Sequence, residues 1–149
     1  MGRIGTALGI AALGGALPVA AAVQSVPAQS VDVDLALNQA TRTYRDKGYS
    51  PAGWQKNGSL ANATDVRETI SLKGGKSYHI VAACDKKCTD LDLQLFDAAG
   101  KEVDWDAQDD NFPIVTTYAQ TTQVYTVRVV MSACGKGACV YGAKAFIKN

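Results

Sequence analysis

The sequence predicts an all-β domain, an antiparallel, jelly-roll-like β-sandwich of about seven strands, preceded by one amphipathic helix. From residue 65 onward, apolar residues recur at alternate positions in short runs, which is typical of half-buried strands. Gly, Asp and Asn separate these runs and supply the turns. Before residue 48 the apolar spacing is three or four, the period of a helix.

Length and charge limit the alternatives. A chain of 149 residues can bury one sizeable hydrophobic core but not two. Its formal net charge is +1, and basic and acidic side chains are nearly equal in number. A nucleic-acid-binding domain usually carries a marked basic excess, so nucleic acid is not an expected partner.

Residues 1–22 are predicted to be a secretory signal peptide. Arg3 is followed by a long uncharged run of Ala, Gly and Leu, and small residues precede the expected cleavage after residue 22, or alternatively after residue 28. An uncleaved anchor is the alternative, but Pro18 and the many glycines make the run a poor membrane span. We therefore expect a periplasmic or secreted bacterial protein with no membrane span after cleavage.

Four cysteines occur in two close pairs, Cys84 with Cys88 and Cys134 with Cys139. An even number of cysteines in an exported chain favours disulfides over zinc, and neither spacing is that of a common zinc ribbon. Each pair brackets a short polar loop after an apolar run, which favours local pairing. The two crossed connectivities remain open.

The helix is expected over residues 31–47. Its apolar stripe has spacings of four, three and four, and consists of Val33, Leu37, Ala40 and Tyr44. Ser30 is a candidate N-cap and Gly48 a candidate stop. Such a helix covers an end or edge of the domain, or else docks a partner.

Residues 48–64 are rich in Gly, Ser, Asn and Pro and are predicted to be a linker. The domain organisation is therefore a helix and linker over 30–64 and a sandwich over 65–149. Trp54 in this linker is a candidate contact for a protein or glycan partner, because exposed aromatics suit both. The alternative is that Trp54 packs against the sandwich.

Seven strands are expected in the sandwich, over residues 66–72, 76–84, 90–97, 101–107, 112–118, 122–133 and 140–147. In the second of them, His79 faces away from Tyr78 and Ile80.

The third and fourth strands are expected to form a hairpin with a three-residue loop and Gly100 in the left-handed conformation. This register sets Leu95 opposite Val103 and Leu93 opposite Trp105, so that one face is uniformly apolar. Trp105 is therefore expected in the core.

The same register crowds carboxylates on the other face, where Asp92 lies opposite Asp106 and close to Asp90 and Asp104. Residues 85–110 contain nine acidic side chains and three lysines, a local charge of −6. Because like charges opposite one another destabilise a sheet, these four aspartates are a candidate calcium site. The alternative is a solvated acidic face, or carboxylates bonded to loop amides and basic strands.

The sequence resembles the bacterial pre-peptidase C-terminal domains over about residues 65–147. The matching residues are Gly75 and Tyr78 in a turn into a strand, Asp90, Leu91, Asp92 and Leu93 in a DLDL strand, and Tyr125, Val127 and Val129 in a late strand. The resemblance implies a small jelly-roll-like sandwich that acts as a non-catalytic accessory module, binding collagen, carbohydrate or calcium in some members. The added helix and cysteine pairs look like those of free-standing exported proteins.

No catalytic pattern stands out. His79 is the only histidine and no G-x-S-x-G motif occurs. Paired carboxylates can hydrolyse glycosides, but a general acid needs burial, and these aspartates are expected on a polar face. We therefore expect a non-enzymatic module that binds a protein or cell-envelope partner, with calcium as a candidate stabilising ion. A carbohydrate-binding or glycan-acting protein is the alternative.

Overall fold

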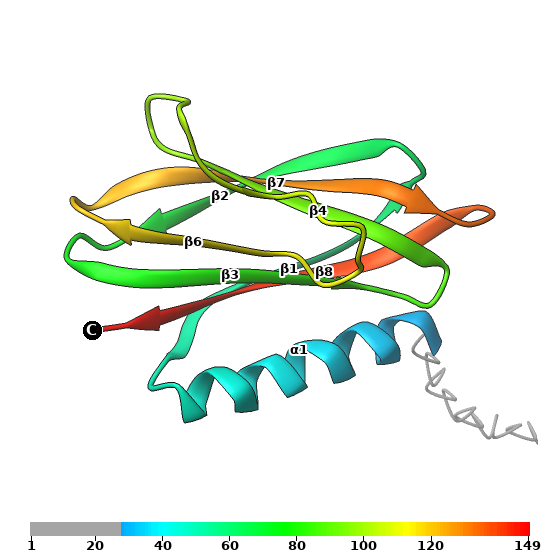
Figure 1. Cartoon of the computed structure of the whole chain (residues 1–149), viewed down its shortest axis with the longest axis horizontal. Coiled ribbons are helices and arrows are strands. Elements are labelled where there is room, and N and C mark those ends of the chain that lie inside the picture. Colours follow the sequence, from blue (N-terminus) through cyan, green and yellow to red (C-terminus); the bar gives the residue numbers. More distant parts are fainter. Residues whose placement is uncertain (1–27) are drawn as a thin grey trace, which may run out of the picture.

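The computed structural model describes residues 28–149, which form one helix and two four-stranded antiparallel sheets (Figure 1). The elements are α1 (Ala28–Asp46), β1 (Ser50–Ala61), β2 (Thr64–Leu72), β3 (Lys76–Cys84), β4 (Cys88–Phe96), β5 (Glu102–Asp106), β6 (Ile114–Ala119), β7 (Gln123–Cys134) and β8 (Ala138–Lys148). The predicted signal peptide lies outside the described residues.

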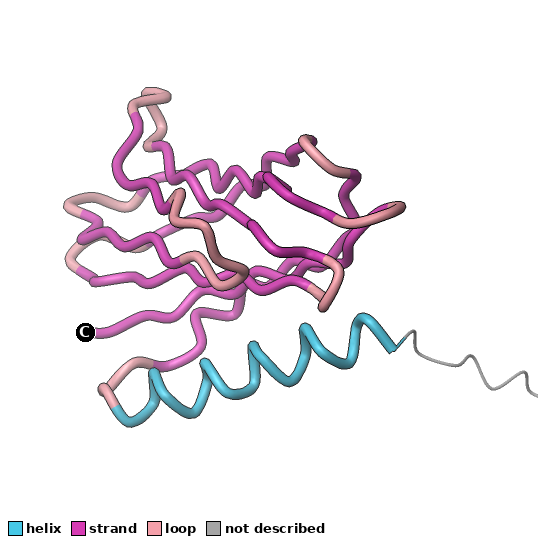
Figure 2. The backbone as a smooth tube through the Cα atoms, turned by 45° about the vertical axis from the view of Figure 1, so that its right-hand side comes forward, coloured by secondary structure: helices cyan, strands magenta, loops and turns pink. Residues whose placement is uncertain are grey.

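The strands are arranged in three layers with the helix. Sheet A has the order β1-β8-β3-β6, sheet B has the order β2-β7-β4-β5, and α1 lies against the outer face of sheet A (Figures 1 and 2). The chain changes sheet at every connection between strands except the β4–β5 hairpin. The predicted β-sandwich is therefore confirmed.

The main core lies between the sheets. Alternate residues of each strand face inward, and the largest that are fully buried include Leu72, Ile80, Leu91, Leu93, Leu95, Val115, Val127 and Met131. The seven predicted strands are all present, with ends that differ from the predicted ones by two residues at most. The alternating pattern therefore located the strands correctly.

One strand was missed. Residues 50–61, predicted to be part of a linker, form β1, which pairs with β8 except at an irregularity between Pro51 and Gln55. Its Gly, Ser and Asn content concealed it, because such residues are depleted in strands. As an edge strand with one neighbour, β1 buries only alternate side chains in part, so a strong apolar pattern is not required.

The helix packs on sheet A through the predicted stripe of four residues, all of them buried. They contact Val81, Ala83 and Phe146 and form a second, smaller core. Gly142 of β8 allows this close approach, because a Cβ there would lie 2.8 Å from Val33 Cγ1 and 2.9 Å from Leu37 Cδ1. The helix thus covers part of the domain as predicted, but it covers the face of sheet A over β8 and β3 rather than an end or edge.

The helix ends as predicted but begins earlier. Its last residue is Asp46, and the amide of Gly48 donates to the carbonyl of Arg45 at 2.9 Å. The described residues are helical from Ala28 onward, so Ser30 lies inside the helix and is not its N-cap. The prediction of a cap at Ser30 was wrong.

We expect Leu37→Ala to lower the free energy of unfolding by about 2–5 kcal/mol, the usual cost of truncating a buried leucine. Leu37 is 2% exposed beneath the helix, whereas Leu35 on the same helix is 61% exposed. The matched variant Leu35→Ala should change stability by less than about 0.5 kcal/mol. Urea unfolding measures both, and equal effects would contradict the packing of α1 on sheet A.

Candidate functional site

The β4–β5 hairpin turns as predicted but pairs in another register. Gly100 has φ +79°, and the amide of Asp97 donates to the carbonyl of Lys101 at 2.9 Å, which closes the expected loop. Beyond the loop, Phe96 pairs with Glu102 but Leu95 pairs with Asp104. Val103 is therefore an extra residue in β5, a β-bulge of the kind common in edge strands.

The bulge reverses the faces of β5. Asp104 lies opposite Leu95 and Asp106 opposite Leu93, so both carboxylates are on the inward side of the sheet. Trp105 lies opposite Gln94 on the outer face and is 56% exposed. The prediction that Trp105 belongs to the core was wrong.

The inward carboxylates bind the edge of the other sheet. Asp104 Oδ2 accepts from the amide of Thr116 at 2.6 Å, and Asp106 Oδ2 accepts from the amide of Ile114 at 2.8 Å. Both donors belong to β6, an edge strand whose unpaired amides otherwise lack a partner. Asp104 and Asp106 therefore close one side of the sandwich.

Trp54 closes the opposite side. Its Nε1 donates from β1 to the carbonyl of Thr69 in β2 at 3.0 Å, and its ring packs against the main core. The half-buried ring also borders a cavity of about 340 Å³ that Ile70 and Tyr78 help to line. These contacts match the packing alternative, and a role in binding a glycan or protein stays a prediction.

Asp90 and Asp92 remain on the outer face of sheet B, away from the inward-facing pair. Ser132 donates to Asp92 Oδ2, while Oδ1 of each aspartate is buried without a hydrogen-bond partner. Burial raises the pKa of Asp90, and the charges of Asp92, Asp109 and Asp110 raise it further.

The predicted four-carboxylate calcium site is therefore not assembled. Asp104 and Asp106 are taken up by the amides of β6, and Asp90 and Asp92 lie on the other face of the sheet. Over residues 28–149, no three His, Cys, Asp or Glu side chains are grouped so that they could hold a metal ion. The one-residue bulge is the physical reason why the four carboxylates do not share a face, and calcium binding itself stays a prediction.

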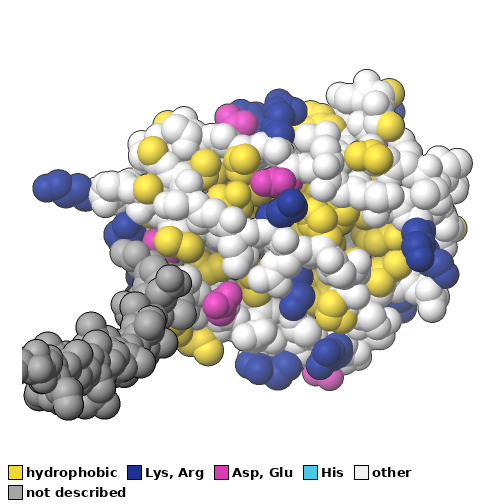
Figure 3. Space-filling model, turned by 180° about the vertical axis from the view of Figure 1, so that it is seen from behind, with side chains coloured by type: hydrophobic (Ala, Val, Ile, Leu, Met, Phe, Trp, Pro, Cys, Tyr) yellow, Lys and Arg dark blue, Asp and Glu magenta, His cyan; other side chains and the backbone are white. Residues whose placement is uncertain are grey.

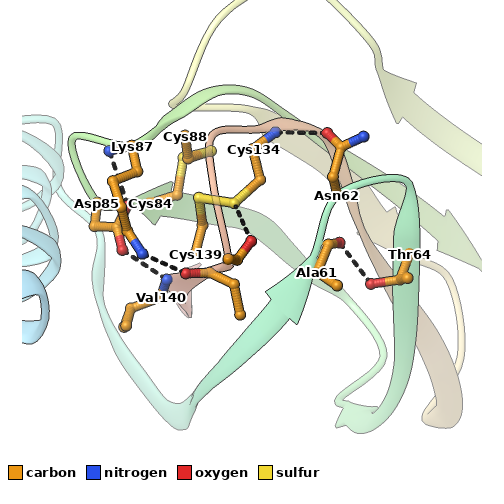
Figure 4. Close-up of a disulfide and its surroundings, with 12 residues drawn as sticks. Ala61, Asn62, Thr64, Cys84, Asp85, Lys87, Cys88, Cys134, Cys139 and Val140 are labelled. Carbon is orange, nitrogen blue, oxygen red and sulfur yellow. Dashed lines mark hydrogen bonds between the residues drawn. A yellow bond between two sulfur atoms is a disulfide. The ribbon is translucent and has the colours of Figure 1, made fainter.

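The other carboxylates of the acidic segment mostly serve turns. Asp97 accepts from the amides of Ala99 and Lys101, and Asp110 accepts from the amide of Phe112. Asp85, which is fully buried, accepts from the amides of Lys87 at 3.0 Å and Val140 at 2.8 Å (Figure 4). The alternative of carboxylates bonded to backbone amides thus describes most of this segment.

The cysteines form the two predicted local disulfides, Cys84–Cys88 and Cys134–Cys139 (Figure 4). The first joins β3 of sheet A to β4 of sheet B, and the second joins β7 of sheet B to β8 of sheet A. Cys88 and Cys134 are also cross-strand partners. Both disulfides therefore tie the sheets together at one end of the sandwich.

The part of sheet A beside the helix presents an apolar groove. Its volume is about 320 Å³, and it lies between α1 and the β6 side of the sheet; we call it the α1–β6 groove. The lining residues are Ala36, Gln39, Ala40, Thr43, Tyr44 and Lys47 of the helix, with Phe112 and Ile114 opposite. Small side chains on the helix leave the gap open.

Beyond the end of α1, the same sheet face holds a polar depression of about 250 Å³, which we call the tyrosine pocket. It is lined by Tyr49, Ser77, Tyr78, His79, Thr116, Thr117 and Tyr118. Tyr44 links the two sites, because its ring lines the groove and its hydroxyl lies 3.1 Å from His79 Nδ1.

Burial shifts the pKa values of His79 and Tyr44, which lie between the two sites. It lowers the pKa of His79, and the charge of Lys47 lowers it further, so the imidazole is neutral at pH 7. Burial also raises the pKa of Tyr44, with a smaller contribution from Tyr49. Both groups are therefore uncharged hydrogen-bonding partners at neutral pH.

The residues of these two sites were not predicted as a site. Strand alternation does indicate that Ile114, Thr116 and Tyr118 share one face of β6. It does not indicate which part of that face a helix leaves uncovered, since this depends on how α1 lies on the sheet.

Figure 3 shows the side of the molecule opposite to that in Figure 1. Lysines and arginines are scattered among acidic and apolar side chains there, and neither sign of charge gathers into a patch. This distribution agrees with the nearly balanced charge of the sequence.

We expect Asp106→Ala to lower the free energy of unfolding by about 1–3 kcal/mol, because the half-buried amide of Ile114 loses its acceptor. Asp109→Ala is the matched control, since Asp109 accepts no hydrogen bond within the described residues and should cost less than about 0.5 kcal/mol. Denaturant unfolding of both variants is the measurement. Equal stabilities would show that the β5–β6 contacts do not hold that side closed.

We expect Asp90→Asn to stabilise the protein at pH 7. The pKa of Asp90 is raised in the folded state, so stability falls as the pH rises from the unfolded pKa through the folded one. The side-chain amide of the asparagine cannot ionise, so the variant does not lose stability over this pH range. The variant should have the higher melting temperature at pH 7, and the difference between the two melting temperatures should shrink towards pH 4. A variant less stable than the parent at pH 7 would contradict the unfavourable burial of this charge.

No family model and no curated protein matches the chain. A solved structure with some similarity is that of PliG from Aeromonas hydrophila, a periplasmic inhibitor of g-type lysozyme. The two share 13% sequence identity, with a TM-score of 0.49 over 64% of this chain and 85% of the inhibitor. Within residues 28–149, no helix has the length and apolar character needed to cross a membrane.

Proposed function

We propose that this chain is an exported, non-catalytic binding module that holds a protein partner at the α1–β6 groove. The observation that carries the proposal is an apolar, solvent-open groove between α1 and Phe112 and Ile114. Concave sites with apolar walls and few polar groups are where proteins most often bind ligands and partner side chains.

Export is supported by the cysteines. All four form disulfides, and disulfides persist in oxidising compartments such as the periplasm and the extracellular space. The predicted signal peptide of residues 1–22 points to the same destination.

The groove is built for an apolar side chain. Ala36, Ala40 and Thr43 are short, so the helix stands back from Phe112 and Ile114 and leaves room for one large side chain of a partner. Of the described residues that line the groove, only Lys47 is charged. A partner with a leucine or aromatic side chain next to a carboxylate complements both features.

The groove is also held in place before any partner arrives. Its helical wall is fixed by Leu37 and Tyr44, which are buried against the sheet, and its other wall is bonded to β5 through Asp106. A preformed site loses little conformational entropy on binding, which favours affinity.

A non-catalytic role is supported by the surroundings of His79. Its described contacts are with Tyr44 and Tyr49, and no carboxylate of residues 28–149 hydrogen-bonds to it. A histidine that acts as a general base is normally oriented by such a partner.

The relation to pre-peptidase C-terminal domains stays a proposal, because it depends on short motifs in residues 65–147. Those motifs supply strands of the sandwich, and they include Asp90 and Asp92 on the outer face of sheet B. Calcium has no part in the proposed binding, since the four aspartates named for it lie on two faces.

We test the groove by placing a photo-crosslinking amino acid at Thr43 in the full chain, expressed in the periplasm of its host. A protein partner should crosslink on irradiation, and the further substitution Ala36→Glu should lower the yield about tenfold, because it places a charge in the apolar gap. Melting temperatures verify that the variants are folded.

Two matched controls distinguish crosslinking at the groove from nonspecific crosslinking elsewhere on the surface. The same photoreactive residue at Val124, which is 52% exposed on β7, should not capture this partner. Leu35→Glu, a charge on the exposed side of the same helix, should leave the yield from Thr43 unchanged. Crosslinks that Ala36→Glu does not reduce, or that form equally from Val124, would contradict the proposal.

A further inference from the structure

We infer that the tyrosine pocket is a second binding site, and that it takes one carboxylate-bearing sugar unit of a glycan. This goes beyond the proposed function, because the ligand is a saccharide and the residues that contact it lie outside the α1–β6 groove.

The floor of the pocket is fixed by strand register. Ser77 and His79 of β3 are cross-strand partners of Tyr118 and Thr116 of β6, respectively. Alternation places all four side chains on the outer face of sheet A, while Tyr78 between them is buried in the core. Because α1 ends at Asp46, it reaches this two-by-two arrangement at His79, where the ring of Tyr44 packs with centroids 5.0 Å apart.

The polar groups of this floor are available to a ligand except for the hydroxyl of Thr116, which donates to Asp104 Oδ2 at 3.3 Å. Within residues 28–149, no hydrogen bond is made by the side-chain hydroxyls of Ser77, Tyr49 and Tyr118. His79 bonds to Tyr44 through Nδ1, which leaves Nε2 free. Donors and acceptors that converge on one small space suit the vicinal hydroxyls of a sugar ring.

Two tyrosine rings supply the apolar contacts that a pyranose also needs. Tyr118 is 55% exposed on β6, and Tyr49 lies over His79 with ring centroids 4.7 Å apart. A tyrosine presents an apolar ring and a polar tip, as a sugar presents C–H groups and hydroxyls. The pocket therefore matches a sugar in both kinds of contact.

The neutral imidazole adds a directed hydrogen bond. Tyr44 keeps its proton at neutral pH because burial raises its pKa, so it can donate to Nδ1 of His79. In the tautomer that accepts this bond at Nδ1, the proton of the imidazole resides on Nε2, which can donate to a ligand. This arrangement selects an acceptor oxygen and requires no charge on the histidine.

One lysine next to the lining residue Tyr49 supplies the preference for a carboxylate. Lys148 is the cross-strand partner of Ser77, and its Nζ lies 5.3 Å from the ring centroid of Tyr49. The same Nζ donates to the carbonyl of Lys47 at 3.1 Å, which holds the ammonium group at this edge. None of the residues that line the pocket is acidic, and the neighbouring carboxylate of Asp104 is already bonded to the amide and hydroxyl of Thr116.

The size of the depression limits the ligand to one ring. Its volume of about 250 Å³ is below the range of about 300–1,000 Å³ found for drug-sized ligands. The remaining units of a longer glycan would extend over the open surface. A single acidic sugar within a chain is therefore the ligand class that the pocket fits.

Calorimetric titration of the oxidised full chain tests this inference. The probes are tetragalacturonate, a hyaluronan tetrasaccharide and the disaccharide of N-acetylglucosamine and N-acetylmuramic acid, each compared with its carboxyl-reduced form. At least one acidic probe should bind with a Kd below about 10 mM. Lys148→Gln should reduce its affinity to that of the reduced form, and added salt should weaken it.

Tyr118→Ala should weaken binding about tenfold by removing the ring contact. Trp105→Ala is the matched control, because Trp105 is an exposed aromatic of similar exposure on β5 and should leave affinity within about twofold. The inference is overturned if no acidic probe binds, if the reduced forms bind equally well, or if the two variants have the same effect. Each outcome is independent of the groove.

Discussion

The packing of α1 against the outer face of sheet A is the interaction on which both proposed binding surfaces depend. Leu37 and Tyr44 are buried against Phe146 and the neighbouring small residues, so the helix lies over β8 and β3. It stops at Asp46 and leaves the outer face of β6 open. The apolar groove therefore lies along the helix, and the polar pocket lies beyond its end.

The sandwich beneath the helix is closed by side chains as well as by packing. Asp104 and Asp106 bind the free amides of β6 on one side, and Trp54 binds a carbonyl of β2 on the other. The two disulfides join the sheets at one end. These contacts place both surfaces on a rigid frame, which is the condition for recognition without a large cost of ordering.

Patterning predicted what local spacing controls: the helix stripe, seven of the strands and the two local disulfides. Sequence patterning failed for features that depend on tertiary contacts. β1 is an edge strand of low strand propensity, and the bulge at Val103 shifts the register by one residue, which moved Asp104 and Asp106 to the inner side. The site escaped prediction because Tyr49, His79 and Tyr118 come together only through cross-strand pairing and the end point of the helix.

Amide hydrogen exchange of the oxidised protein tests the docking of α1 most directly. The amides of residues 37–44 should be protected to nearly the same extent as those of β3 and β8, because helix and sheet share one buried cluster. Exchange of these helical amides at the rate of an unfolded peptide, while the strands stay protected, would contradict it. The groove would then lack its fixed helical wall, and the end of the helix beside the pocket would not be held in place.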